Sequence, residues 1–123
     1  KKSDIEVVEN ELEMLKKSYL ENKNVEIEIV LEEKVLPYES DKKSKLVNAL
    51  RQAIIDVWNE PPKLIRKTGT GDMNIFGEVY NKPMVTYGPG DSRLDHTDME
   101  FIEINEFLKS IDVYSKCITY LTL

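Results

Sequence analysis

The spacing of apolar residues predicts a helix, a strand and a second helix in the first half of the chain. Residues 5–19 carry apolar side chains at intervals of three and four, as one face of a helix does. Over residues 25–31 the odd positions are apolar and most even positions are glutamate, which is typical of a half-buried strand. A second helical spacing spans residues 46–57 and ends before Pro61 and Pro62, because proline cannot continue a helix. This order is typical of a small α+β sandwich that lacks its first strand.

The second half of the chain has a different character. All five glycines fall between residues 69 and 90. We expect a short helix over residues 72–76 and a buried strand over residues 83–87. From Ile104 to Leu121 the apolar residues return to helical spacing, which predicts a closing helix with one apolar side.

Composition excludes several classes of function. The chain has 123 residues, about one ordinary domain, and a net charge of −6, whereas nucleic-acid binding requires a basic face. No apolar run approaches the roughly 20 residues that span a bilayer. Cys117 is the single cysteine and forms no disulfide framework, so a cytoplasmic location is expected. The chain starts at Lys1 rather than Met, and we expect it to be a processed or expressed fragment.

A glycine-rich segment over residues 67–74 is the first candidate for chemistry. Gly69 and Gly71 alternate with threonines just before the expected short helix. Such a loop lets backbone N–H groups approach an anionic or carbonyl oxygen, and Thr70 adds a hydroxyl. The alternative is a connecting loop in which Asp72 caps the helix.

His96 is the second candidate. It follows the Gly-Pro-Gly turn at residues 88–90 and is flanked by Asp95, Asp98 and Glu100. An imidazole among carboxylates suits a metal ligand or an acid–base group. The alternative is an exposed histidine in an acidic loop, because one histidine does not make a metal site.

The basic pair Arg66 and Lys67 directly precedes the glycine-rich segment. The two side chains are candidates to bind a substrate carboxylate, the arginine through its bidentate fork. An ordinary exposed pair is an equally good interpretation. Cys117 and Trp58 are expected to pack in the core rather than to function.

Taken in order, these motifs resemble the C-terminal part of the acetylornithine deacetylase and succinyl-diaminopimelate desuccinylase family of dinuclear metallohydrolases. Residues 69–72 match the substrate-loop motif of that family. Residues 87–90, followed by His96 and Glu100, match its terminal metal-ligand motif. The longer segment 67–74 is most similar to the branch that releases lysine or ornithine from an amino-group carrier protein or deacetylates the equivalent N-acetyl amino acids.

The resemblance implies an α/β fold class and an incomplete two-domain, metallo-exopeptidase-like fold. Residues 1–60 would be a partial lid and dimerisation domain, and residues 61–123 the C-terminal segment of the catalytic domain. His96 would bind one metal of a pair, zinc or cobalt. The candidate substrate-binding residues are Arg66, Lys67, Gly69, Thr70 and Gly71.

The chain also departs from the family pattern. The H-x-D motif, the Glu-Glu general base and the lid histidine of the family have no counterpart here, since Glu32-Glu33 follows a lid strand. Residues 31–38 offer no arginine for a substrate carboxylate. We therefore expect no catalytic residue in this chain and no turnover by the chain alone, because hydrolysis needs an activated water and a base.

We expect the chain to be part of an amidohydrolase in lysine and arginine biosynthesis. The enzyme is expected to be a cytoplasmic homodimer that acts on a small amino-acid-derived substrate or on a carrier protein. One alternative is a non-catalytic dimerisation fragment that pairs through the strand at residues 25–31. Another is a carboxypeptidase or aminoacylase of the same chemistry. Alone, the chain is expected to expose apolar surface at residues 83–87 and on its last helix, and to self-associate.

Overall fold

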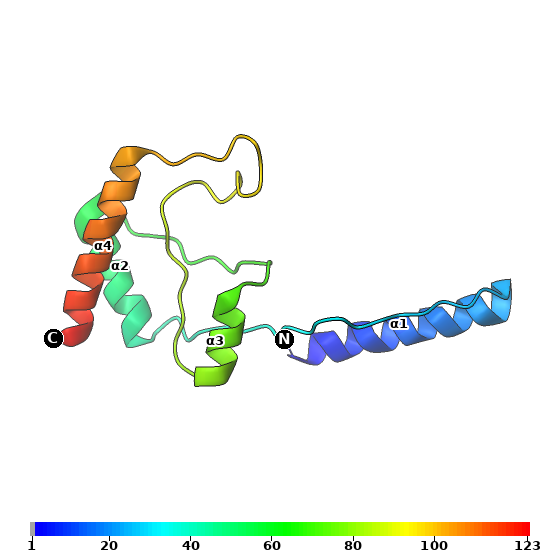
Figure 1. Ribbon diagram of the computed structural model, residues 1–123. Helices are drawn as coiled ribbons and strands as arrows, with labels where there is room; N and C mark the ends of the chain where they lie inside the picture. The colour runs from blue at the N-terminus through cyan, green and yellow to red at the C-terminus, as the bar shows by residue number, and fades with distance from the viewer. Residues whose placement is uncertain (1) are drawn as a thin grey trace. The chain divides into compact units, whose positions relative to one another are not determined.

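The computed structural model describes residues 2–123 and contains helices connected by irregular segments (Figure 1). The helices are α1 (Lys2–Lys23), α2 (Lys45–Trp58), α3 (Asp72–Tyr80) and α4 (Ile104–Thr122). No strand occurs between residues 2 and 123. The α/β fold class expected from the sequence is therefore wrong for the structure of this chain, which is all-helical over the described residues.

The chain forms two compact units. The first unit combines the described residues up to Tyr38 with Gly69–Tyr80. The second unit combines Glu39–Thr68 with Asn81–Leu123. The basic pair Arg66 and Lys67 thus belongs to the second unit, and Gly69 and Gly71 belong to the first.

In the first unit, α1 has the apolar spacing expected of it but buries little of its apolar face. Val8, Leu12 and Leu15 are 53%, 40% and 52% exposed. An amphipathic helix gains stability when its apolar stripe leaves water, so α1 gains little from packing within the described residues.

After α1 the chain turns and runs back along the helix (Figure 1). Asn24 makes the turn with a positive φ of 48°, a conformation that asparagine tolerates well. Lys34 Nζ lies 2.7 Å from Glu9 Oε1 and joins the returning segment to α1. The strand predicted over residues 25–31 is not formed. Its backbone groups need a neighbouring strand, and residues 2–123 supply none.

The helix α3 contacts the segment that precedes Glu39. Asn74 Nδ2 donates to the Leu36 carbonyl at 3.0 Å. Gly77 is buried against the ring of Tyr38, and a Cβ at Gly77 would overlap that ring. The glycine therefore allows the aromatic ring to lie directly on the helix backbone.

In the second unit, α2 and α4 pack against each other around a small apolar core. Ala53 and Val113 are fully buried, and the small side chain of Ala53 leaves room for the neighbouring helix. The buried residues of the pair are Val47, Ala49, Leu50, Ala53, Ser110, Val113 and Cys117. The predictions that Cys117 and Trp58 serve packing are confirmed: Cys117 is buried and Trp58 packs against the core.

The apolar side predicted for α4 is not the side that α2 covers. Ser110, Val113 and Cys117 face the core instead. The apolar row that the spacing indicates is largely exposed, with Ile104 at 77% and Ile118 at 61%. Its members are Ile104, Leu108, Ile111, Tyr114, Ile118 and Leu121. The helix thus has two adjacent rows of mainly apolar residues, and α2 covers only one of them. The expected exposed apolar surface on the last helix is present.

Residues 83–87 form no strand either, although they lie against the helix pair. Tyr87 packs against the core, and its carbonyl accepts a hydrogen bond from the Tyr114 hydroxyl. The Met84 N–H donates to Ser40 Oγ at 2.5 Å. Side chains of the second unit thus satisfy backbone groups that a neighbouring strand would bind in a sheet.

Candidate functional site

The loop that carries His96 is built from three consecutive turns. We call residues 91–103 the His96 loop. The N–H of Leu94 donates to the Asp91 carbonyl at 2.9 Å, and the N–H of Thr97 to the Leu94 carbonyl at 3.1 Å. A third turn joins Glu100 to Thr97 at 3.1 Å. Each bond spans three residues, so the shape of the loop is determined locally by turn residues.

His96 is the third residue of the middle turn. Its φ of 64° lies in the left-handed region, which is uncommon for a residue other than glycine. Its N–H donates to Glu100 Oε2 at 3.1 Å, so the neighbouring carboxylate holds the backbone in this conformation. The residue is exposed. The turn therefore presents the imidazole to solvent or to a ligand. Backbone conformations of this uncommon kind cluster at functional sites, so His96 is a candidate for a functional test.

The two basic candidates have different acidic neighbours. Lys67 Nζ lies 3.9 Å from Asp95 Oδ2, which places Lys67 beside the residue that precedes His96. Arg66 Nη2 lies 2.6 Å from Glu39 Oε1, and both of these side chains are largely exposed. Exposed pairs of this kind contribute at most about 1 kcal/mol. A carboxylate ligand could replace either acidic partner at small cost.

The glycine-rich segment leads into α3 in the first unit. Asp72 is the first residue of the helix, and Asn74 Oδ1 accepts from the Gly71 N–H at 3.3 Å. A Cβ added at Gly69 or Gly71 would meet nothing within 4 Å. Packing within the described residues therefore does not require these glycines, and the open space beside their backbone is available to a ligand. Thr70 is exposed between them.

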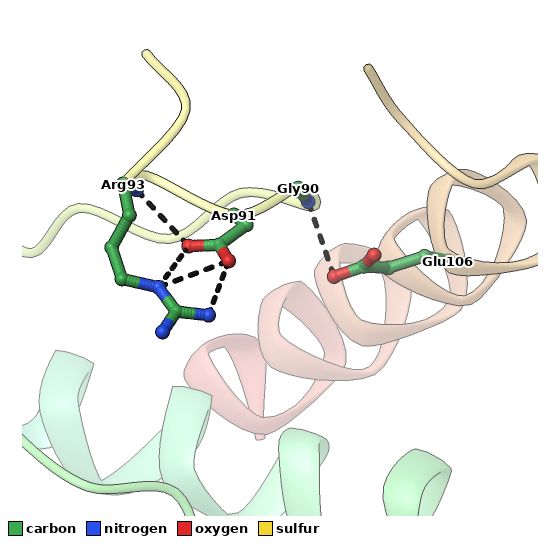
Figure 2. A network of polar contacts seen from close by, with 4 residues as sticks. All are labelled: Gly90, Asp91, Arg93 and Glu106. Carbon is green, nitrogen blue, oxygen red and sulfur yellow. Dashed lines mark hydrogen bonds and ion pairs between the residues drawn. The ribbon is translucent and has the colours of Figure 1, made fainter. Parts of the chain in front are cut away.

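A polar network at the start of the His96 loop was not predicted from the sequence (Figure 2). Arg93 Nε lies 2.9 Å and 3.0 Å from the two carboxylate oxygens of Asp91, and the Arg93 N–H also donates to Asp91. Hydrogen bonds from the Arg93 side chain, followed by its backbone N–H, lower the pKa of Asp91 to about 2. The signal in the sequence is an aspartate two residues before an arginine, directly after the glycine turn.

The second part of this network connects the loop to α4. Gly90 has a φ of 98°, and its N–H donates to Glu106 Oε1 at 3.1 Å. Glu106 belongs to the first turn of α4. This contact joins residues 16 positions apart, so no local pattern in the sequence indicates it.

The described residues do not make a complete metal site by themselves. No group of three or more His, Cys, Asp or Glu side chains suited to a metal ion occurs among residues 2–123. His96 supplies one exposed imidazole. The carboxylate of Glu100 accepts a hydrogen bond from the His96 backbone N–H. A metal at His96 would need further ligands from elsewhere.

Comparison with known proteins identifies the family. The model of peptidase family M20/M25/M40 matches residues 2–120, nearly the whole chain. The chain belongs to this family. Members of the M20 family generally use divalent metal ions. The resemblance inferred from the glycine-rich segment and the His96 motif is thereby confirmed.

Curated relatives of this M20 chain are named as hydrolases. A LysW-lysine/LysW-ornithine hydrolase of Sulfurisphaera tokodaii is 40% identical over 90% of this chain and 31% of its own length. A LysW-lysine hydrolase of Deinococcus radiodurans is 40% identical over 65% of this chain and 22% of its own. A provisionally named LysW-lysine/LysW-ornithine hydrolase of Pyrococcus horikoshii is 47% identical over 62% of this chain and 23% of its own.

This M20 chain therefore spans about a quarter of the length of such relatives, between 22% and 31%. None of the helices between residues 2 and 123 is both long and apolar enough to cross a membrane.

Proposed function

We propose that this chain is part of a metal-dependent hydrolase of amide C–N bonds that releases lysine or ornithine from a precursor linked to an amino-group carrier protein or N-acylated. Membership of the M20 family and the names of relatives such as those from S. tokodaii and D. radiodurans support this function. The proposal places the protein in lysine or arginine biosynthesis, in the cytoplasm.

The observation that carries the proposal is the presentation of His96. An exposed imidazole stands on a left-handed turn whose N–H is bound by Glu100. We assign to His96 the role of one ligand to one of two zinc or cobalt ions. The remaining ligands and the general base are residues outside these 123, and none of the described side chains is assigned a catalytic role. When bound, the metal pair supplies electrophilic activation at the amide.

The substrate side of the proposal uses the two sequence motifs as separate binding elements. Gly69, Thr70 and Gly71 offer an accessible backbone and a hydroxyl to a carbonyl or carboxylate oxygen. Arg66 and Lys67 bind the substrate carboxylate and exchange their exposed acidic partners for it. In the complete protein, residues 1–60 belong to a lid that makes a homodimer and residues 61–123 to the catalytic domain. The position of this boundary stays a prediction.

The test of function is a hydrolysis assay on the longest protein that the gene encodes. The protein is depleted of metal, resupplied with zinc or cobalt, and given lysine or ornithine linked to the carrier protein, the N-acetyl amino acids and dipeptides. We expect metal-dependent release of lysine or ornithine from the carrier-linked or acetylated substrates. Hydrolysis of dipeptides alone would replace the proposal with the carboxypeptidase interpretation.

A paired substitution tests the carboxylate-binding role in the same assay. Arg66→Ala should raise KM for the carrier-linked or acetylated substrate by about tenfold, the size of one charge-assisted contact. Lys63→Ala, an exposed basic residue three positions earlier, is the matched control and should leave KM unchanged. Equal KM values for the two variants would remove Arg66 from the substrate site.

A non-catalytic dimerisation fragment is a second candidate, favoured by the exposed apolar residues of α1 and α4. Val8 and Leu15 on α1 and Ile104 on α4 are each more than half exposed. Size-exclusion chromatography with light scattering on the 123-residue chain tests this function. A dimer that persists at micromolar concentration would support it, and a monodisperse monomer would exclude it.

A further inference from the structure

One hydrogen bond closes the base of the His96 loop. The Gly90 N–H immediately before the loop donates to Glu106 Oε1 at 3.1 Å, and Glu106 stands in the first turn of the helix that follows the loop (Figure 2). The bond thus joins the beginning of the loop to the helix at its end. Bringing the two ends of a loop together costs conformational entropy. Once the ends are held by this bond, the turns inside the loop form from local contacts.

The backbone at this point is shaped for the bond. Gly90 has a φ of 98°, which side chains other than glycine rarely adopt. The carbonyl of Phe101, near the other end of the loop, lies 3.8 Å from the place of a Cβ on Gly90. The two ends of the loop therefore come close together, and Glu106 is only partly exposed. A partly buried N–H with a carboxylate acceptor forms one of the stronger hydrogen bonds in a protein.

The other contacts of the loop do not fix it in the same way. Its three turns and the Asp91–Arg93 pair are local, so they set the shape of the loop but not its attachment. Lys67 and Asp95 approach to 3.9 Å with both side chains exposed, which is a weak tether. The attachment of the loop to the helix pair thus depends mainly on Glu106.

We propose that Glu106 is a positioning residue that, through the Gly90 N–H, holds the loop closed so that His96 is presented in one place. The proposal rests on the proposed function for the importance of that place, but loop closure itself is independent of any activity. A second role for Glu106 must be separated from it, because a negative charge in the first turn of α4 also favours the helix dipole.

Two conservative substitutions separate hydrogen bond from charge. Glu106→Gln removes the charge but keeps an oxygen at the same reach from the helix, so the Gly90 N–H retains an acceptor. Glu106→Asp keeps the charge in the first turn but is one methylene shorter and withdraws the acceptor. Asp112→Asn on the exposed side of α4 is the control for loss of one negative charge from the same helix.

The experiment measures amide hydrogen exchange and steady-state hydrolysis in the longest protein that the gene encodes. Glu106→Asp should speed exchange in the His96 loop about tenfold, the equivalent of one hydrogen bond, with Val113 in the core of α4 unchanged. The same variant should lower kcat by a similar factor with little change in KM, because the presented group and not the substrate pocket is affected. Glu106→Gln and Asp112→Asn should resemble the unchanged protein in both measurements.

Three results would overturn the proposal. Unchanged loop exchange in Glu106→Asp would mean that the bond to Gly90 does not close the loop. A defect in Glu106→Gln with normal behaviour of Glu106→Asp would assign the effect to charge at the helix end. Faster loop exchange without any change in kcat would show that closure does not position a working group, and would count against the role of His96 as well. The first two results leave the proposed function untouched.

Discussion

The two units of this chain differ in how much of their apolar surface they bury. In the second unit, α2 and α4 enclose Ala53 and Val113 completely. In the first unit, α1 also carries apolar residues at helical spacing, yet Val8 and Leu15 stay about half exposed. Regular spacing makes a helix able to pack, but burial depends on a matching surface within the chain. The second unit contains that surface, and the first does not among the described residues.

The same contrast applies to the segments predicted as strands. Residues 83–87 gain contacts from the helix pair, including the hydrogen bond from the Tyr114 hydroxyl to the Tyr87 carbonyl. Residues 25–31 instead follow an isolated helix and keep Val30 and Leu31 about two-thirds exposed. A segment with the composition of a strand packs against the surfaces that the rest of the chain supplies. It becomes part of a sheet only where another strand lies beside it.

The largest expected effect comes from a charge in the core of the second unit. Val113→Asp should cost about 3–5 kcal/mol, because the carboxylate would be buried without a partner, and should abolish protected amides in α2 and α4. Val8→Asp on α1 is the matched variant and should change the free energy of unfolding by less than about 0.5 kcal/mol. Urea unfolding followed by circular dichroism measures both. Equal losses would contradict the difference between the units.

A smaller effect is expected in the first unit at Gly77. A valine there would overlap the ring of Tyr38 and should cost about 1–3 kcal/mol, as overpacking does. The readout is faster amide exchange in α3, with α2 and α4 unaffected. Gly69→Ala, where a Cβ meets nothing within 4 Å, is the control. Unchanged exchange in α3 of the valine variant would mean that Tyr38 does not pack on this helix.

A still smaller loss of stability is expected when the contact of residues 83–87 with the helix pair is weakened. Tyr114→Phe removes the hydroxyl that donates to the Tyr87 carbonyl and should cost about 1 kcal/mol of unfolding free energy. Phe preserves the ring contact with Tyr87, whose centroid lies 5.6 Å away. Thermal unfolding measures the loss, and an unchanged melting temperature would contradict the role of this hydrogen bond.

The smallest effect concerns the pH dependence of the Asp91–Arg93 pair. The pKa of Asp91 is lowered from 3.8 to about 2 in the folded chain, so its contribution to loop stability is complete above its ordinary pKa and is lost as the pH falls toward 2. Arg93→Gln should raise the pKa of Asp91 toward 3.8. Carbon-detected NMR titration of the Asp91 carboxyl measures both values. A midpoint near 3.8 in the unchanged protein would show that the pair does not form.

The sequence predicted the features that depend on neighbours in the chain. Helical spacing predicted α2 and α4, and prolines predicted the end of α2 near Trp58. The short helix expected at residues 72–76 is α3, extended to Tyr80. The glycine-rich segment and the His96 motif are both short and local, and together they were sufficient to indicate the family.

Features that depend on distant partners were not predictable. The strands predicted at residues 25–31 and 83–87 are not formed, because a strand requires a neighbouring strand and residues 2–123 contain none. Which row of α4 is buried depends on the shape of α2, and the spacing of apolar residues alone does not indicate that Ser110 and Val113 belong to that row. Likewise, the contact of Glu106 with Gly90 forms because the two ends of the His96 loop come together. No short sequence motif indicates this contact.

The most direct test of the account is the metal content of a His96 variant in the longest protein that the gene encodes. His96→Ala and the control Asp98→Asn, an exposed neighbour in the same loop, are dialysed with zinc or cobalt and the bound metal is counted per chain. We predict that His96→Ala loses one bound metal and nearly all hydrolysis while its circular dichroism is unchanged, and that Asp98→Asn keeps both. Full metal content and near-normal hydrolysis in His96→Ala would contradict the central claim.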